Sequence, residues 1–207
     1  YETVENKLLH IYADSGNFDE AHMIFSSLTD KDAVSWGTMI AAYSKHGKYS
    51  MAMRSFEEMQ QKGIKPNHVI FTSLLAVCSH SGLLDEAQVH FHNMNKHYGL
   101  TQTMEHHACM VVVFGLAGHF DEAMSVIKIM PSSDHVEIWL ALLDACRRWG
   151  NVKLGTLAFD QIIQIDNNCA SAYIIIANIF AAAGMQKDAE NVKAMRHKYV
   201  ERAKYVG

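Results

Sequence analysis

The chain has 207 residues, of which 49% are hydrophobic and 19% are charged, an ordinary composition for a folded protein. No apolar run approaches the roughly 18 residues of a membrane-spanning helix, so we expect no membrane partner. A net charge of −4 argues against strong binding of nucleic acid over the whole surface, because negative charge repels phosphate.

Four columns of residues recur along the chain with a period of 31 to 36 residues, which indicates repeats. The anchor of each repeat is a glycine: Gly16, Gly47, Gly82, Gly118, Gly150 and Gly184. Five positions later comes a small residue: Ala21, Ala52, Ala87, Ala123, Gly155 and Ala189. Eight positions before it comes an apolar residue: Leu8, Met39, Leu74, Met110, Leu142 and Ile176. Nine positions after it come Phe25, Phe56, Phe91, Ile127 and Phe159, and Lys193 breaks this last column.

Each repeat contains two stretches with helical periodicity, joined by a short turn that holds the glycine. In the second repeat these stretches are residues 35–45 and 49–61, whose apolar residues recur at steps of three and four. The glycine suits the left-handed residue that ends a helix, and the small residue, such as Ala87, lets the two helices approach closely. One such hairpin cannot bury its apolar face alone. The sequence therefore predicts an all-α solenoid of six stacked hairpins, about twelve helices.

Tetratricopeptide and pentatricopeptide repeats both fit this period, and particular segments decide between them. Residues 33–40 (AVSWGTMI), 63–67 (GIKPN) and 67–82 (NHVIFTSLLAVCSHSG) are similar to pentatricopeptide repeats. Residues 139–151 (WLALLDACRRWGN) and 173–184 (YIIIANIFAAAG) resemble two E motifs. The chain thus resembles a plant-type pentatricopeptide repeat protein of the PLS subfamily with C-terminal E motifs.

The resemblance implies a right-handed superhelix and a subtype for each repeat. In chain order these are an S-type repeat (1–32), a P-type repeat (33–67), an L-type repeat (68–103), a terminal S-type repeat (104–135), a first tetratricopeptide-like E motif (136–169), and a second E motif with a basic tail (170–207).

The function implied by this family is sequence-specific binding of single-stranded organellar RNA at sites of C-to-U editing. The E motifs would recruit or position a DYW-type cytidine deaminase domain, in cis or in trans, and multiple organellar RNA editing factors are further expected partners. The chain itself is expected to have no catalytic residue, cofactor or metal. Its location would be the mitochondrion or the chloroplast, and we expect it to be a piece of a longer protein whose transit peptide lies outside this sequence.

Members of the family use two side chains per repeat to recognise one base and an aliphatic residue to sandwich it. The base-reading pairs implied here are Asn6 with Asp32, Gly37 with Asn67, Thr72 with Thr103, and Ala108 with His135. The sandwiching positions are Thr3, Val34, Val69 and Glu105. The Asn6–Asp32 pair resembles a uridine reader, although both residues could instead cap helices or face solvent. Gly37 and Ala108 have no hydrogen-bonding side chain, and Glu105 is a poor platform for a base.

Other patterns suggest chemistry that we do not expect. His135 and Glu137 spell half of a zinc-deaminase signature, but no P-C-x-x-C follows. His106 and Cys109 on one helix could supply at most two metal ligands. The aromatic column of Trp36, Phe71, Trp139 and Tyr173 is interpreted as packing between helices rather than base stacking.

An alternative function of a different class is a helical scaffold for protein–protein interaction. The similarity of the E motifs to tetratricopeptide repeats and the negative net charge both suit it.

Overall fold

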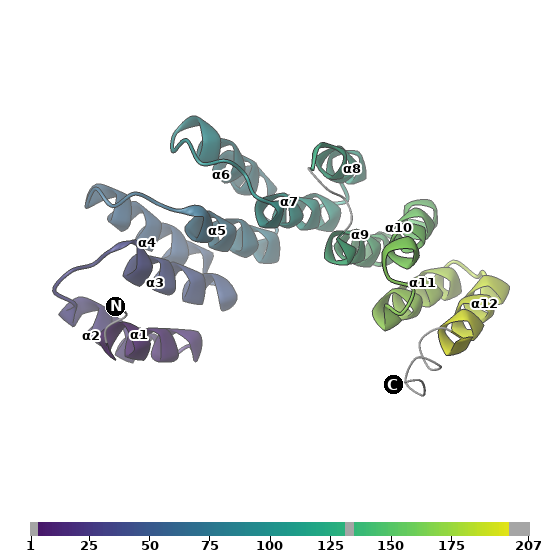
Figure 1. Ribbon diagram of the computed structural model, residues 1–207, viewed down its shortest axis with the longest axis horizontal. Coiled ribbons are helices and arrows are strands. Elements are labelled where there is room, and N and C mark those ends of the chain that lie inside the picture. The colour runs from purple at the N-terminus through teal and green to yellow at the C-terminus, as the bar shows by residue number, and fades with distance from the viewer. Residues whose placement is uncertain (1–3, 131–134, 199–207) are drawn as a thin grey trace. The chain divides into compact units, whose positions relative to one another are not determined.

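The computed structural model of the chain describes residues 4–130 and 135–198, and within these ranges it contains twelve α-helices and no strand. The helices are α1 (Val4–Asp14), α2 (Phe18–Ser27), α3 (Ala33–Lys45), α4 (Tyr49–Gln61), α5 (His68–Ser81), α6 (Leu84–Lys96), α7 (Met104–Leu116), α8 (Phe120–Ile129), α9 (Val136–Trp149), α10 (Val152–Ile165), α11 (Ala170–Ala182) and α12 (Gln186–Arg196) (Figure 1). None of the helices in these ranges is long and apolar enough to cross a membrane. The predicted all-α class is therefore confirmed.

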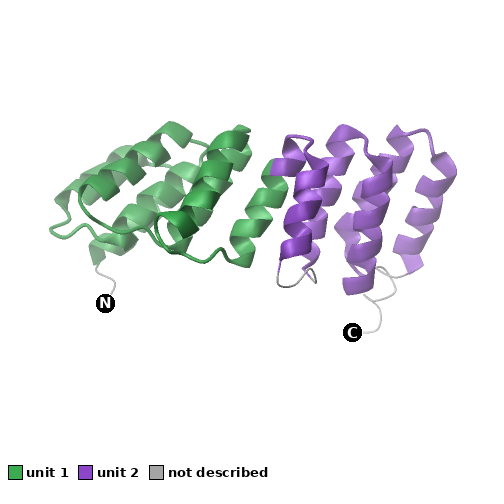
Figure 2. Cartoon of the chain, turned by 90° about the horizontal axis from the view of Figure 1, so that it is seen from above, with its two compact units in different colours: residues 1–113 green, residues 114–207 purple. Residues whose placement is uncertain are grey.

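The chain forms two compact units, residues 1–113 and 114–207, and their boundary falls within α7 (Figure 2). In the first unit α1 packs on α2, α3 on α4 and α5 on α6, while the first helices of successive hairpins also pack together, α1 on α3 and α3 on α5. In the second unit α9 packs on α10, α11 on α12, and α9 on α11. Each unit is thus a stack of antiparallel hairpins, as the repeats predict, whereas the right-handed sense of the superhelix and the subtype of each repeat stay predictions.

The recurring glycine ends the first helix of every hairpin in a left-handed conformation. All six anchor glycines have φ between +66° and +81°, a region that side chains with a β-carbon rarely adopt. In the third repeat Gly82 has φ +69°, and the next amide, Leu83 N–H, donates to the Cys78 carbonyl at 2.9 Å. The glycine column therefore marks the point where the chain reverses, as its spacing predicted.

The small residue in the second helix of each hairpin lies in the tightest part of the core. Ala21, Ala52, Ala87, Ala123 and Ala189 are all completely buried. At the sixth position of this column, a β-carbon on Gly155 would lie 2.9 Å from Ile179 Cδ1, so even an alanine would need its neighbour to move. The burial of Ala87 agrees with its predicted position between the two helices of its hairpin.

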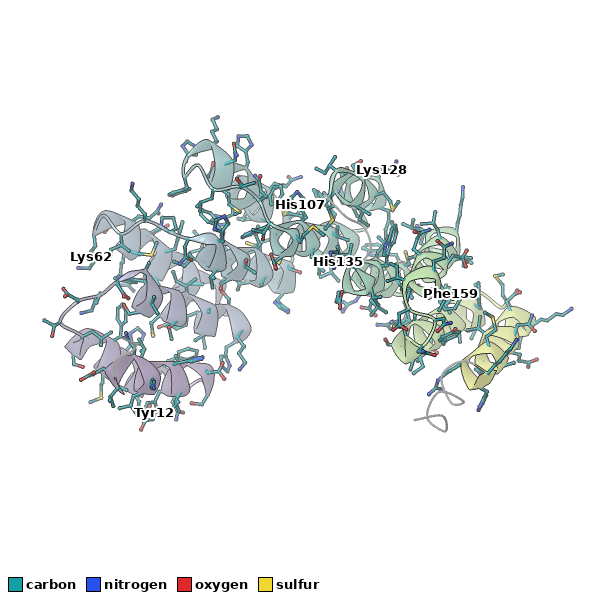
Figure 3. All side chains as sticks on the ribbon, in the orientation of Figure 1. Tyr12, Lys62, His107, Lys128, His135 and Phe159 are labelled. Carbon is teal, nitrogen blue, oxygen red and sulfur yellow. The ribbon has the colours of Figure 1, made fainter. Side chains whose placement is uncertain are left out.

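The aromatic column packs against the preceding hairpin at several junctions between hairpins. Edge-to-face ring pairs recur across the junctions, with centroid distances of 4.7 Å for Phe25–Trp36, 5.7 Å for Phe56–Phe71, 5.3 Å for Phe91–His107 and 5.3 Å for Phe159–Tyr173 (His107 and Phe159 are labelled in Figure 3). Trp36, Phe71, Trp139 and Tyr173 are all at most 5% exposed. The interpretation of this column as core packing is confirmed.

Candidate nucleic-acid interface

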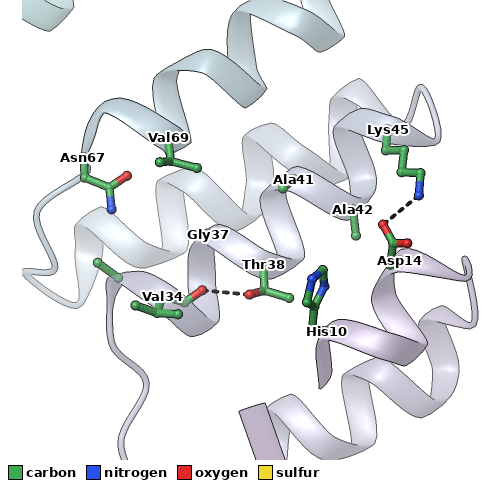
Figure 4. A pocket seen from close by; sticks show the side chains of 11 residues that line it. His10, Asp14, Val34, Gly37, Thr38, Ala41, Ala42, Lys45, Asn67 and Val69 are labelled. Carbon is green, nitrogen blue, oxygen red and sulfur yellow. Dashed lines mark hydrogen bonds and ion pairs between the residues drawn. The ribbon is translucent and has the colours of Figure 1, made fainter. Parts of the chain in front are cut away.

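A cavity of about 370 Å³ opens where the first helices α1, α3 and α5 lie side by side (Figure 4). Its walls include four of the predicted RNA-contacting residues: Val34, Gly37, Asn67 and Val69. Val34 and Val69 are 57% and 64% exposed, at the starts of α3 and α5, so two branched aliphatic side chains stand in solvent beside one cavity. A flat ring placed between these two side chains would remove their apolar surface from water, which is favourable.

Asn67 caps α5, and this capping bond fixes the orientation of its amide. Its Oδ1 accepts a hydrogen bond from Ile70 N–H at 3.1 Å. The Nδ2 group, a double donor, has no hydrogen-bond partner among the described residues (Asn67 is labelled in Figure 4). Gly37 leaves room next to it, because a β-carbon there would lie 3.5 Å from Ile70 Cγ1, an ordinary contact distance. The second repeat therefore presents one oriented donor and an open position.

The same cavity holds residues that sequence reasoning did not identify: His10, Asp14, Thr38 and Lys45. Lys45 Nζ lies 2.7 Å from Asp14 Oδ1, and this cation holds the pKa of the Asp14 carboxyl below its usual value. Both side chains are about half exposed, so the pair contributes little stability, but it places a positive charge at the mouth of the cavity. Their spacing could have indicated this, because they lie close to whole helical turns from predicted RNA-contacting positions on the same helix. Thr38, for example, follows Val34 by four residues.

Asn6 and Asp32 of the first repeat line one cavity of about 380 Å³, together with the carboxylates Glu5 and Asp30. Asp32 also caps α3, because its Oδ1 accepts from Val34 N–H at 3.1 Å and from Ser35 N–H at 2.9 Å. Capping and base reading were treated as alternatives for this residue, but the cap uses only one of its two carboxylate oxygens. Thr3, the predicted sandwiching residue of this repeat, lies outside the described residues.

The Thr72–Thr103 pair of the third repeat is brought together, but a third side chain joins it. The His106 ring is completely buried, with Nε2 lying 3.1 Å from Thr72 Oγ1 and Nδ1 lying 2.7 Å from Thr103 Oγ1. Glu105, the predicted sandwiching residue, is exposed and accepts a hydrogen bond from the Thr103 hydroxyl. His106 was missed as part of the pair, although a polar residue in a buried column was a usable signal.

The predicted fourth pair falls in two different units. Ala108 is half-buried on α7 in the first unit, and His135 is the exposed N-cap of α9 in the second, with no hydrogen bond from its side chain to the helix. Glu137 is also exposed. In the described ranges no group of three or more His, Cys, Asp or Glu side chains could hold a metal ion.

Family models match most of the segments that form these repeats. A model described as a PPR repeat matches residues 6–32, 69–98 and 108–135, and a PPR repeat family model matches residues 31–78, so that together they span more than half of the chain. The chain belongs to the pentatricopeptide repeat family. An E motif model matches residues 149–204, from the end of α9 onward. It covers the later part of the predicted first E motif and nearly all of the second.

The pentatricopeptide relatives include organellar proteins of Arabidopsis thaliana. A mitochondrial pentatricopeptide repeat-containing protein is 36% identical over 201 residues, covering 97% of this chain and 33% of the relative. A chloroplastic one is also 36% identical over 201 residues and covers 97% of this chain and 23% of the relative. The chain therefore spans a third or less of the length of these two relatives.

Solved structures of maize PPR10 share the fold. The crystal structure of PPR10 matches with a TM-score of 0.73 and 20% identity, covering 93% of this chain and 29% of that one. The structure of PPR10 in complex with an 18-nucleotide RNA element matches with a TM-score of 0.74 and 16% identity, covering 97% of this chain and 30% of that one. Identity at this level supports a common fold.

Proposed function

We propose that this chain binds single-stranded RNA along the face that carries the starts of its first helices, with one base at each repeat. The observation that carries the proposal is the pair of exposed valines, Val34 and Val69, on the walls of the cavity that also holds Asn67. A base inserted between them would bury both of its faces against aliphatic side chains. Its edge would then meet the Asn67 Nδ2 donors. The PPR10 structure bound to an RNA element supports the same use of the fold.

The repeats should differ in how strongly they select a base. All four bases present acceptors, so one amide donor opposite Gly37 should discriminate weakly. The Asn6–Asp32 pair offers an amide together with the carboxylate oxygen that the cap does not use. Because this pair carries both donor and acceptor groups, the first repeat should select most strongly, and the family pattern suggests uridine.

Electrostatics should make the binding weak and sensitive to salt. The net charge is −4, and Lys45 in the cavity is already paired with Asp14. Glu5 and Asp30 add negative charge beside the first pair. Phosphate attraction therefore comes from few cations, and added salt screens it further.

The role in C-to-U editing is the finer part of the proposal. The E motif match supports a second unit that contacts a DYW-type cytidine deaminase domain, in cis or in trans, or multiple organellar RNA editing factors. The chain would place the RNA, and the deaminase would supply the catalysis. The mitochondrial and chloroplastic relatives support an organellar location.

The test is a titration of the 207-residue chain with single-stranded RNA at low salt. The double variant Val34→Ala/Val69→Ala should lose affinity by about five- to tenfold, because four methyl groups that cover the base are removed. Val89→Ala on α6 is the matched control, since Val89 is similarly exposed, at 55%, on a second helix. Equal affinity of the double variant and the control would contradict the proposed interface. Failure of the wild-type chain to bind any RNA would favour the protein-binding scaffold.

A further inference from the structure

His106 occupies a core position that is apolar or small in the other repeats. Counting back twelve residues from Gly47, Gly82, Gly150 and Gly184 gives Ser35, Ile70, Ile138 and Ala172, all at most 3% exposed. At the start of the array the equivalent residue is Val4, which is 71% exposed. The pair of the second repeat, Gly37 and Asn67, is followed by Ile70 in the next repeat, whose side chain offers it no polar atom. The pair of the third repeat is followed at the equivalent position by His106, whose imidazole lies between the two threonines. The surroundings of the two base-reading pairs therefore differ in one side chain, which is apolar beside the pair of the second repeat and polar beside the pair of the third.

The hydrogen bonds of His106 fix its tautomer. Thr103 N–H donates to Nδ1 at 3.0 Å, so Nδ1 is the acceptor and carries no hydrogen. Nε2 therefore carries the hydrogen in the neutral ring, and it lies 2.9 Å from the backbone carbonyl oxygen of His68. Both ring nitrogens are thus engaged by fixed backbone groups, one next to each reader threonine. The ring is held in place by α5 and by the segment that leads into α7.

The two threonine hydroxyls each have a single hydrogen, and both hydrogens are used within the protein. Thr72 Oγ1 donates to the carbonyl oxygen of His68 at 3.1 Å, which turns its lone pairs toward His106 Nε2–H. Thr103 Oγ1 lies within hydrogen-bonding distance of both His106 Nδ1 and the Glu105 carboxylate. Because Nδ1 already accepts from Thr103 N–H, the hydroxyl hydrogen goes to Glu105. A base edge that approaches this pair must therefore compete with bonds that already exist.

We propose that His106 determines the specificity of the third repeat by occupying the Thr72–Thr103 pair, so that this repeat accepts a nucleotide without selecting its base. This inference rests on the proposed function, because it concerns the same one-base-per-repeat interface. It assigns a role to a residue outside the pair positions and the sandwiching positions. Ile70, at the equivalent position after the pair of the second repeat, shows that the fold also accommodates an apolar side chain there.

The experiment is selection of bound sequences from a random pool of single-stranded RNA, followed by titration of single-base variants. The register is set by the base whose preference changes in Asp32→Asn, and the third repeat faces the base two positions away. In the wild-type chain the four bases at that position should bind within about twofold of one another. In His106→Ile, which copies Ile70 and Ile138, the Thr72 Oγ1 lone pair that faces His106 Nε2 becomes available to a base. A preference of about fivefold or more should then appear, the effect of one hydrogen bond.

A second substitution separates release of the pair from a general change in shape. Thr72→Val removes the hydroxyl at nearly constant volume, so the double variant His106→Ile/Thr72→Val should lose most of the gained preference. A wild-type preference above fivefold at this position would overturn the inference, and so would a His106→Ile preference equal to that of the wild type. Preference at the other repeats shows whether the proposed function itself holds. If no variant binds RNA, both proposals fail together.

An independent readout does not need RNA. Nitrogen-15 NMR of the wild-type chain at neutral pH should show the His106 ring neutral, with its hydrogen on Nε2. A hydrogen on Nδ1 would overturn the inference even if His106→Ile failed to fold.

Discussion

The second and third repeats have the same scaffold and opposite states of their predicted base-reading pairs. In the second, Gly37 leaves a vacant position and the Asn67 amide keeps its donors for a ligand. In the third, Thr72 and Thr103 carry more hydrogen-bonding groups, yet the Thr72 hydroxyl lies against His106 Nε2 and the Thr103 hydroxyl donates to Glu105. The comparison teaches that the number of polar groups at the two pair positions does not alone decide how well a repeat can select a base. What matters is which of those groups the protein has already used.

The largest expected effect tests whether the scaffold under the two repeats is really the same. Ala52 and Ala87 are both completely buried at equivalent positions of the second helices. Replacement of either by leucine should overpack the core and reduce the free energy of unfolding by ~1–3 kcal/mol. The thermal midpoint should fall by about 2–4 °C for each kcal/mol. Val89→Leu, at an exposed position of α6, should leave the midpoint unchanged, and unequal losses at Ala52 and Ala87 would weaken the comparison.

A smaller effect should appear with pH, because only the third repeat has a buried imidazole at its pair. Burial lowers the pKa of His106, and the nearby titratable groups are His68 on α5 together with Glu105 and His107 on α7. Burial also lowers the pKa of His90. As the pH falls, the histidines of the unfolded chain therefore take up protons before those of the folded chain. The free energy of unfolding should be highest above the ordinary histidine pKa of about 6.5 and should decline below it.

Thermal unfolding at pH 7.5, 6.5 and 5.5 measures this decline. The midpoint of the wild-type chain should fall by a few degrees between pH 6.5 and 5.5. The variant His106→Ile should fall by less. Parallel curves for the two proteins would show that the imidazole is not held neutral by its surroundings.

The open pair of the second repeat can be converted into a selective one by adding a single hydroxyl. Gly37→Thr places a hydroxyl beside the Asn67 amide, and the space around Gly37 accepts a β-carbon. The preference among bases at this position should rise to about fivefold, as expected for one added hydrogen bond. Gly37→Ala is the matched control, because it brings the same β-carbon and an even larger gain in helix propensity without a polar group. A similar rise in the alanine variant would assign the effect to stability of α3.

The smallest expected effect concerns charge at the mouth of the cavity. Lys45→Gln removes the cation paired with Asp14 and should weaken RNA binding by about two- to threefold for every sequence alike. Lys45 lies eight residues after Gly37 on α3, which is about two helical turns away from the base-reading pair. Base preference should therefore not change. A selective loss for one base would mean that Lys45 contacts the base rather than the phosphate.

Much of this fold could be predicted from the sequence, because its determinants are local and recur in every repeat. The glycine requires a left-handed residue, the alanine requires close helices, and both constraints appear at fixed spacing. The same register predicted that Val34, Gly37, Asn67 and Val69 would meet in one place, and they line one cavity. These features depend on single helices and on short turns, where spacing and physical role correspond directly.

The state of the third pair could not be predicted in the same way. The bond between Thr72 and His106 joins residues 34 positions apart, and it depends on how α5 and α7 rotate against each other. Likewise, the base contact that we propose for Asp32 beside its cap depends on which carboxylate oxygen turns toward the helix. Spacing places such residues near one another, but it does not determine which atoms form bonds.

The most direct test of the account is the position-by-position base preference of the wild-type chain, measured by selection from random single-stranded RNA. The account predicts the strongest preference at the base facing Asn6 and Asp32, a weak preference at the next base, which faces Gly37 and Asn67, and none at the base facing Thr72 and Thr103. A selected motif whose sharpest position faces the third repeat would contradict it. So would the absence of any enriched sequence at low salt.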